Sequence, residues 1–299
     1  MSSPIKNVAV AGASGYIGKA AVRALMDAGF AVTVLTREGS TSTFPAGTVQ
    51  KSVDYSSVES LASALEGQDA LVSTLASLPF ESQTPLVDAA VAAGVRRIIP
   101  SEYGINTRIL RDEPIGTILG SKAQTLNYIH EKWKQNPSFT WTGISQGLSF
   151  DWGLIHGSLG LDKTTKTATI FDSGDEPYQS TSLSQLGKAV VSVLAHPIET
   201  ANRYMTIASF NPTQNQVLAA VEKITGEKWA VNRVPTSGQQ QIGCEKLGRG
   251  DYGAFRPLLM KRVYEDGAGL AVLGPDNAGD LLGLEGDDIE GLLRAWLAE

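Results

Sequence analysis

Three glycines near the N-terminus are spaced so that they could hold phosphate groups. Gly12, Gly15 and Gly18 follow an apolar run at 7–11 and open a helical pattern at 15–28. In such a strand–turn–helix unit the first glycine allows the tight turn, the second lets the backbone approach a pyrophosphate, and the third lets the helix pack closely on the sheet. Free N–H groups and the positive end of the helix dipole then attract phosphate. We therefore expect a dinucleotide to be bound by Gly12, Ser14, Gly15, Tyr16, Ile17 and Gly18.

The end of the next apolar run, at 31–35, indicates which dinucleotide. Arg37 lies 19 residues after Gly18, near the position where an NAD site carries a carboxylate for the ribose hydroxyls. A guanidinium can instead hold a 2′-phosphate through two hydrogen bonds, and the hydroxyl residues at 40–42 could add donors. The sequence therefore predicts NADP(H). Glu38 leaves NAD(H) open, because a shift of one residue would bring its carboxylate to the ribose.

Two lysines on a predicted helix at 115–134 could exchange protons. Tyr128 and Lys132 satisfy the Y-x-x-x-K pattern of ordinary short-chain reductases, but at about 100° per residue they lie on the helix flank. Lys122 instead falls in the middle of an apolar stripe that we expect to face the sheet, which is costly unless the lysine meets a partner or acts chemically. We expect Lys122 to hold the cofactor ribose and to exchange a proton with the substrate; a lysine that reaches the helix edge is the alternative. The stripe is formed by Ile115, Ile118, Leu119, Leu126, Ile129 and Trp133.

The ends of other predicted strands supply further candidates. Ser77 and Leu78 follow the run at 70–75 and could line the nicotinamide ribose. Tyr103 follows the run at 96–100, where it could donate a hydrogen bond to the substrate, stack on it, or take part in catalysis. Glu102 beside it fits a structural role equally well. A patch after 145 suits either an apolar aromatic pocket or a core aromatic cluster. The expected substrate contacts are Tyr103, Gly147, Phe150 and Trp152.

The elements that must position these residues alternate between strand and helix through the first half of the chain. This alternation predicts an α/β fold, a Rossmann-type doubly wound parallel sheet with a smaller C-terminal substrate lobe. We place an NADP-binding domain at 4–149, to which part of 180–208 returns, and a substrate-binding lobe at 150–299. Residues 235–280 resist assignment. The expected strands lie at 7–11, 31–35, 49–53, 70–75, 96–100 and 140–144.

Composition excludes several classes of protein. The chain has 299 residues and a formal net charge of −6 without a block of like charges, so no nucleic-acid partner is indicated. It contains no apolar run of about 18 residues and no basic leader, so we expect neither a membrane partner nor secretion. The single cysteine, Cys244, suits a reducing, cytoplasmic location. The histidines have no partners at metal-ligand spacing. We expect a monomer or weak homodimer that binds a small-molecule substrate.

These motifs resemble those of the NmrA-like and isoflavone-reductase-like proteins, which are atypical short-chain dehydrogenases/reductases. The resemblance is strong over about 5–150 and points to fungal members, which often serve secondary metabolism. It implies a Rossmann-type domain, a C-terminal substrate lobe and NADPH. The family usually shows P-S-E-F-G followed by Asp, whereas this chain has Tyr103 and then Ile105, so substrate specificity does not carry over. The matches are the G-A-S-G-Y-I-G turn at 12–18, Leu35-Thr36-Arg37-Glu38, Leu65-x-Gly67-x-Asp69, P-S-E-Y-G at 100–104 and Lys122.

Together these features predict an NADPH-dependent reductase of a small, aromatic secondary metabolite, with hydride transfer assisted by Lys122. A redox-neutral enzyme of the cyclase or isomerase type that retains NADP in its pocket stays open. So does a non-catalytic NADP-sensing regulator, although sensor relatives lack a lysine at the position of Lys122.

Overall fold

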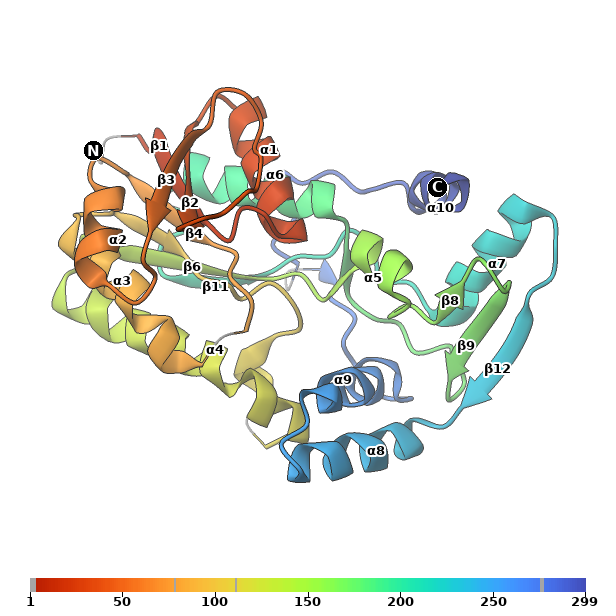
Figure 1. Cartoon of the computed structure of the whole chain (residues 1–299). Helices are drawn as coiled ribbons and strands as arrows, with labels where there is room; N and C mark the ends of the chain where they lie inside the picture. The colour runs from red at the N-terminus through yellow and green to blue at the C-terminus, as the bar shows by residue number, and fades with distance from the viewer. Residues whose placement is uncertain (1–3, 78, 111, 275–276) are drawn as a thin grey trace.

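A parallel sheet forms the centre of the larger part of the molecule (Figure 1). The computed structural model describes residues 4–77, 79–110, 112–274 and 277–299. Within this part of the chain the sheet has seven strands in the order β11-β6-β5-β4-β1-β2-β3, all parallel to their neighbours. The strands are β1 Asn7–Ala11, β2 Ala31–Arg37, β3 Val49–Val53, β4 Ala70–Ser73, β5 Arg97–Ile99, β6 Thr140–Ser145 and β11 Arg203–Thr206.

The strand order creates a crevice beside β1. The chain builds β1, β2 and β3 outward in one direction and then crosses to the other side of β1 to start β4. Ligands of open α/β sheets bind at such a switch point, outside the carboxyl ends of the strands. The glycine turn at 12–18 follows β1 directly, so it lies at this crevice.

Two layers of helices cover the sheet. One face carries α1, Tyr16–Asp27, and α6, Leu183–Ala195; the other carries α2, Val58–Leu65, α3, Thr84–Ala92, and α4, Pro114–Gln135. Alternate residues of β1 serve the two faces: Val8 and Val10 pack toward α1 and α6, whereas Ala9 and Ala11 pack toward α2 and α3. These observations confirm the expected doubly wound α/β fold.

The remaining elements form a smaller lobe to the right of the sheet in Figure 1. Its hairpin β8–β9 is extended by β12 into a three-stranded sheet, and β7 with β10 forms a separate short parallel pair. Residues 235–280 resist assignment from the sequence, and their described part contains α8, α9 and a short 3-10 helix at Tyr252–Ala254. The elements are β7 Leu148–Ser149, α5 Phe150–His156, β8 Leu161–Asp162, β9 Thr167–Phe171, β10 Ser180–Thr181, α7 Gln214–Thr225, β12 Ala230–Val234, α8 Thr236–Gly248, α9 Phe255–Tyr264 and α10 Ile289–Ala298.

Helix α4 joins the two parts because its apolar stripe is divided between two cores. Ile115 and Leu119 near its N-terminus pack into the core of the smaller lobe. Leu126 and Ile129, further along the helix, pack under the sheet. The expectation that the whole stripe faces the sheet is therefore wrong, since a 22-residue helix extends beyond the sheet edge toward α9. Lys122 lies between the two sets of contacts.

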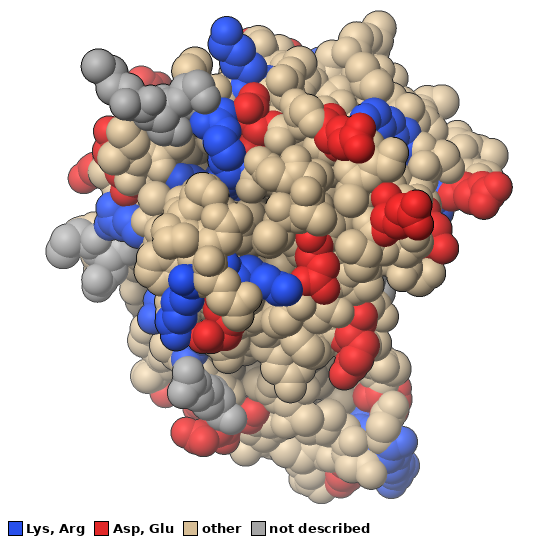
Figure 2. All heavy atoms as spheres, turned by 90° about the vertical axis from the view of Figure 1, so that its left-hand side faces the viewer, with Lys and Arg blue, Asp and Glu red and all other residues tan. Residues whose placement is uncertain are grey.

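The surface carries charges of both signs. On the face shown in Figure 2, basic and acidic side chains are spread out and separated by uncharged ones. Among the helices of the described residues, none is long and apolar enough to cross a membrane.

Candidate functional site

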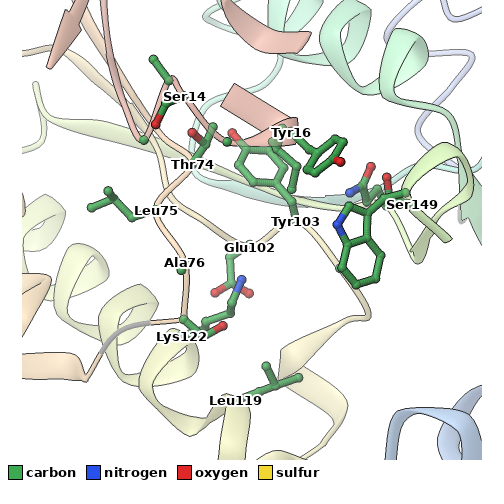
Figure 3. Close-up of a pocket in the computed structure, with 18 of the residues that line it drawn as sticks. Ser14, Tyr16, Thr74, Leu75, Ala76, Glu102, Tyr103, Leu119, Lys122 and Ser149 are labelled. Carbon is green, nitrogen blue, oxygen red and sulfur yellow. The ribbon is translucent and has the colours of Figure 1, made fainter. Parts of the chain in front are cut away.

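A cavity of about 720 Å³ lies at the carboxyl ends of the strands, between the sheet and the smaller lobe. Its wall comes from the turn after β1, the ends of β2, β4 and β5, the middle of α4, the segment 146–149, and helices α5 and α9. Figure 3 shows the part of this cavity around Lys122 and Tyr103. Most of the residues selected from the sequence meet here, although they come from six or more separate elements.

The three glycines of the turn differ in why they must be glycine. Gly12 has φ +80°, and a Cβ there would lie 2.8 Å from the carbonyl of Thr74. A Cβ at Gly18 would lie 2.3 Å from the Gly12 oxygen, so both positions are required by packing within the chain. A Cβ at Gly15 would meet only the Gly12 oxygen, at 3.5 Å, so Gly15 leaves free space beside the cavity.

The start of α1 is suited to an anion. Gly15 is the N-cap residue, it provides no side-chain cap, and the first turn of the helix carries no acidic residue. The first N–H groups of the helix and its dipole therefore favour negative charge at this end. Gly18 lies behind the turn and does not line the cavity. The turn residues that do line it are Gly12, Ser14, Gly15, Tyr16 and Ile17.

The end of β2 brings a positive charge to the far end of the cavity. The strand extends to Arg37, two residues beyond the expected run, and Arg37 lines the cavity together with Ser40 and Ser42. Glu38 is not among the lining residues. Tyr55 and Phe44 complete this end, and the sequence analysis missed both. The Tyr55 hydroxyl donates to the Leu35 carbonyl over 3.0 Å, and burial raises the pKa of Tyr55 to about 12.

Lys122 is held at the end of β5. Its Nζ donates to the Ser101 carbonyl oxygen over 2.5 Å, and its side chain and that of Glu102 lie next to each other beside the cavity (Figure 3). Burial lowers the pKa of the Lys122 ammonium, and the Glu102 carboxylate opposes this effect. The side chain thus neither reaches the helix edge nor lies free in solvent; it is half-buried and lines the cavity.

Three polar atoms around the cavity lack a hydrogen-bond partner within the described protein. They are the Tyr103 hydroxyl, Gln146 Oε1 and Ser149 Oγ, and all three residues line the cavity. Tyr103 is only 7% exposed, and burial raises its pKa well above the usual value, so its hydroxyl remains a neutral donor. Buried polar groups are normally paired, so these atoms are available to hydrogen-bond a ligand or water in the cavity. Gln146 and Ser149 were missed because no local motif marks them.

The aromatic patch after 145 is only partly at the site. Trp152 is 38% exposed and lines the cavity, as does Gly147. Phe150 was expected to contact substrate, but this is wrong: it is fully buried, and its ring packs edge-on against Phe210, 4.8 Å between centroids. Phe150 and Trp152 both lie on α5, and positions two apart on a helix point in nearly opposite directions. One of the two must therefore face the core.

Ser77 lines the cavity from an exposed position after β4, whereas Leu78 lies outside the described residues. The competing pair Tyr128 and Lys132 does not line it. The Tyr128 hydroxyl donates to Asp88 Oδ1 over 2.7 Å, and Lys132 Nζ lies 2.6 Å from the same atom. Both side chains are half-buried and connect α4 to α3, so they form a packing contact away from the cavity.

Comparison with known proteins agrees with this fold. The model of the NmrA-like family matches residues 4–254. The chain is 34% identical over 264 residues to "Oxidoreductase poxI" of Penicillium oxalicum, which covers 88% of this chain and 84% of that protein. The binary complex of leucoanthocyanidin reductase with NADPH from Vitis vinifera superimposes with a TM-score of 0.81 at 19% identity, covering 98% of this chain and 100% of that one. AtPrR2 with NADP+ and (+)pinoresinol gives a TM-score of 0.80 at 19% identity, covering 99% and 100%.

Proposed function

The chain belongs to the NmrA-like family, and from this premise we propose that it is an NADPH-dependent reductase of a small, aromatic secondary metabolite, assisted by Lys122. Its class, an NADP(H)-dependent oxidoreductase, is that of its relatives: a 34% identical protein is named an oxidoreductase, and structural neighbours hold NADPH or NADP+. The observation that carries the proposal is that the glycine turn, Arg37 and Lys122 all line the same cavity.

The residues around the cavity fit a dinucleotide with a 2′-phosphate. The free space beside Gly15 and the uncapped start of α1 suit the pyrophosphate. Arg37 with Ser40 and Ser42 suits the 2′-phosphate, because a guanidinium and two hydroxyls can all donate to it. Lys122 would hold the nicotinamide ribose. When bound, NADPH supplies the hydride.

Lys122 is suited to move a proton at the substrate. Its Nζ is fixed by one hydrogen bond to the Ser101 carbonyl, which leaves further donor positions of the ammonium for a ligand. Its lowered pKa makes the proton easier to give than that of an exposed lysine. In this proposal Lys122 donates a proton to a substrate oxygen and Tyr103 donates a hydrogen bond to the same molecule.

The substrate end of the cavity suits an uncharged aromatic molecule. The walls there are apolar and come from both parts of the chain: Leu119 on α4, Trp152 on α5, and Phe255 and Leu259 on α9. Three unpartnered polar groups at Tyr103, Gln146 and Ser149 could bind hydroxyl or carbonyl groups. In this proposal residues 4–149 bind the cofactor, α6 and β11 complete the domain that holds it, and residues 150–299 supply most of the substrate contacts.

The test is to incubate the protein with NADPH and candidate aromatic metabolites while following NADPH absorbance and product mass together. We expect NADPH to be consumed in step with a product heavier than the substrate by the mass of H2. A product of unchanged mass with constant NADPH absorbance would instead show the redox-neutral chemistry of a cyclase or isomerase.

A further inference from the structure

Glu102 is a buried carboxylate that the proposed reaction does not yet use. It is 2% exposed and lines the cavity immediately beside Lys122. Its Oε2 accepts hydrogen bonds from the Thr107 hydroxyl, over 2.5 Å, and from the Tyr204 hydroxyl, over 3.0 Å. An ionised carboxylate oxygen is the acceptor that two hydroxyl donors can share. These two hydrogen bonds favour the charged form of Glu102 and oppose the burial that raises its pKa.

Tyr204 reaches Glu102 because the sheet makes room for its ring. Tyr204 lies on β11 in register with Gly143 on β6, and a Cβ at Gly143 would lie 2.7 Å from the Tyr204 ring. A glycine inside a strand often marks such a close approach. The Arg108 guanidinium also contacts the Tyr204 ring, at 5.4 Å from the ring centroid. The orientation of the Tyr204 hydroxyl is therefore set by β6, by β11 and by the segment after β5.

We propose that Glu102 is a positioning residue whose ionised carboxylate keeps Lys122 protonated, so that the lysine can give a proton to the substrate. This inference rests on the proposed function. Lys122 gives its proton to a substrate oxygen that has gained negative charge, becomes a neutral amine, and takes a proton from water before the next turnover. Glu102 stays ionised throughout and acts only through Lys122.

The charges around the pair support this assignment. Burial alone would lower the pKa of Lys122, and the Glu102 carboxylate is the group that opposes this. For Glu102, burial is the largest effect and leaves the pKa raised, while the Lys122 charge and the hydrogen bonds from Thr107 and Tyr204 act in the opposite direction and favour the carboxylate. Tyr204 is itself neutral, because burial and the Glu102 charge raise its pKa. Arg108 contacts the Tyr204 ring, whereas the charge that acts on Lys122 is that of Glu102.

Competitive labelling with acetic anhydride measures the pH at which the Lys122 amine loses its proton. The extent of labelling is read by mass spectrometry of the peptide that carries Lys122. The measurement needs neither substrate nor NADPH. We expect Glu102→Gln to lower the labelling midpoint of Lys122 by about one pH unit or more, because an adjacent opposite charge shifts a pKa by about 1–3. Glu102→Asp keeps the charge but withdraws it by one methylene, so we expect a smaller decrease.

Tyr204→Phe is the matched control, because it removes a hydrogen bond from Glu102 but leaves both charges in place. We expect it to move the Lys122 midpoint by less than about half a pH unit. An unchanged midpoint in folded Glu102→Gln, or in Glu102→Asp if the glutamine variant does not fold, overturns the inference. So do equal shifts in Glu102→Gln and Tyr204→Phe. Failure of wild type to consume NADPH would refute the proposed function instead, and would leave the labelling midpoints unaffected.

Discussion

Replacing Lys122 by methionine removes the ammonium while it keeps most of the side-chain volume. The Nζ that donates to the Ser101 carbonyl and faces the cavity is lost, so no group remains there to give a proton. A positioned acid–base group contributes about 10²–10⁴-fold, which corresponds to about 3–5 kcal/mol in the activation free energy. We expect kcat to fall by that factor. NADPH affinity should fall less, because the glycine turn and Arg37 still hold the phosphates.

The matched control is Tyr128→Phe on the same helix. It deletes the hydroxyl that donates to Asp88 Oδ1 but keeps the ring beside Lys132. A half-exposed hydrogen bond of this kind contributes about 1 kcal/mol to the free energy of unfolding. We expect a small decrease in Tm and a kcat within about twofold of wild type, since Tyr128 does not line the cavity.

Both variants should be compared by single-turnover and steady-state NADPH absorbance, with calorimetry for the NADPH dissociation constant and circular dichroism for Tm. The reasoning is refuted if Tyr128→Phe abolishes turnover while Lys122→Met is tolerated, because Tyr128 and Lys132 would then be the catalytic pair. If neither change affects an active enzyme, the hydride mechanism fails, and redox-neutral chemistry near Tyr103 and Trp152 becomes the better explanation.

Three further changes test the cofactor site and the fold. Arg37→Ala should weaken NADPH binding about ten- to hundredfold in calorimetry and leave NADH binding unchanged; equal affinity of wild type for both cofactors would contradict this. Gly15→Ala should keep Tm nearly unchanged, since its Cβ meets only one oxygen at 3.5 Å, yet weaken NADPH binding; unaltered binding would show that the free space is not used. Burial raises the pKa of Asp69, but hydrogen bonds from the Asn7 N–H and from Arg96 outweigh it, so the folded-state pKa is lowered. The stability that Asp69 contributes is therefore fully present above about pH 4 and is lost as the pH falls through the folded-state pKa. The difference in Tm between wild type and Asp69→Asn should accordingly disappear in acid. A difference in Tm that does not change with pH would contradict this.

The parts of the site that depend on local structure could be predicted from the sequence. The glycine turn follows a strand and opens a helix, and the spacing of its glycines is visible within that unit. The close approach at Gly18 is to the turn itself, whereas the one at Gly12 is to Thr74 after β4 and depends on the sheet. Lys122 could be separated from Lys132 because helical periodicity alone places one on the apolar stripe and the other on its flank. Arg37 followed in the same way from its distance along the chain after Gly18.

Other features depend on which distant elements become neighbours. Helical periodicity showed an apolar stripe on α4 but not that the stripe serves two cores, so Lys122 lies where the cavity opens rather than under the sheet. The same limit applies to Phe150, because its place in the sequence fits the core face of a helix as well as the wall of a pocket. Phe255 and Leu259 reach the cavity from a helix in the segment that sequence patterns left unassigned.

The chain's own pattern is sufficient for the alternation of strands and helices, the phosphate-binding turn and the lysine, because each rests on residues within about one strand–turn–helix unit. The hydrogen bond from Tyr204 to Glu102 joins residues 102 positions apart, and it exists only because β11 pairs with β6 and Gly143 admits the tyrosine ring. Such a contact depends on strand order and packing, which the folded chain establishes as a whole. The charge environment of Lys122 is therefore a property of the tertiary structure, whereas the presence of the lysine on the apolar side of its helix is already contained in the sequence.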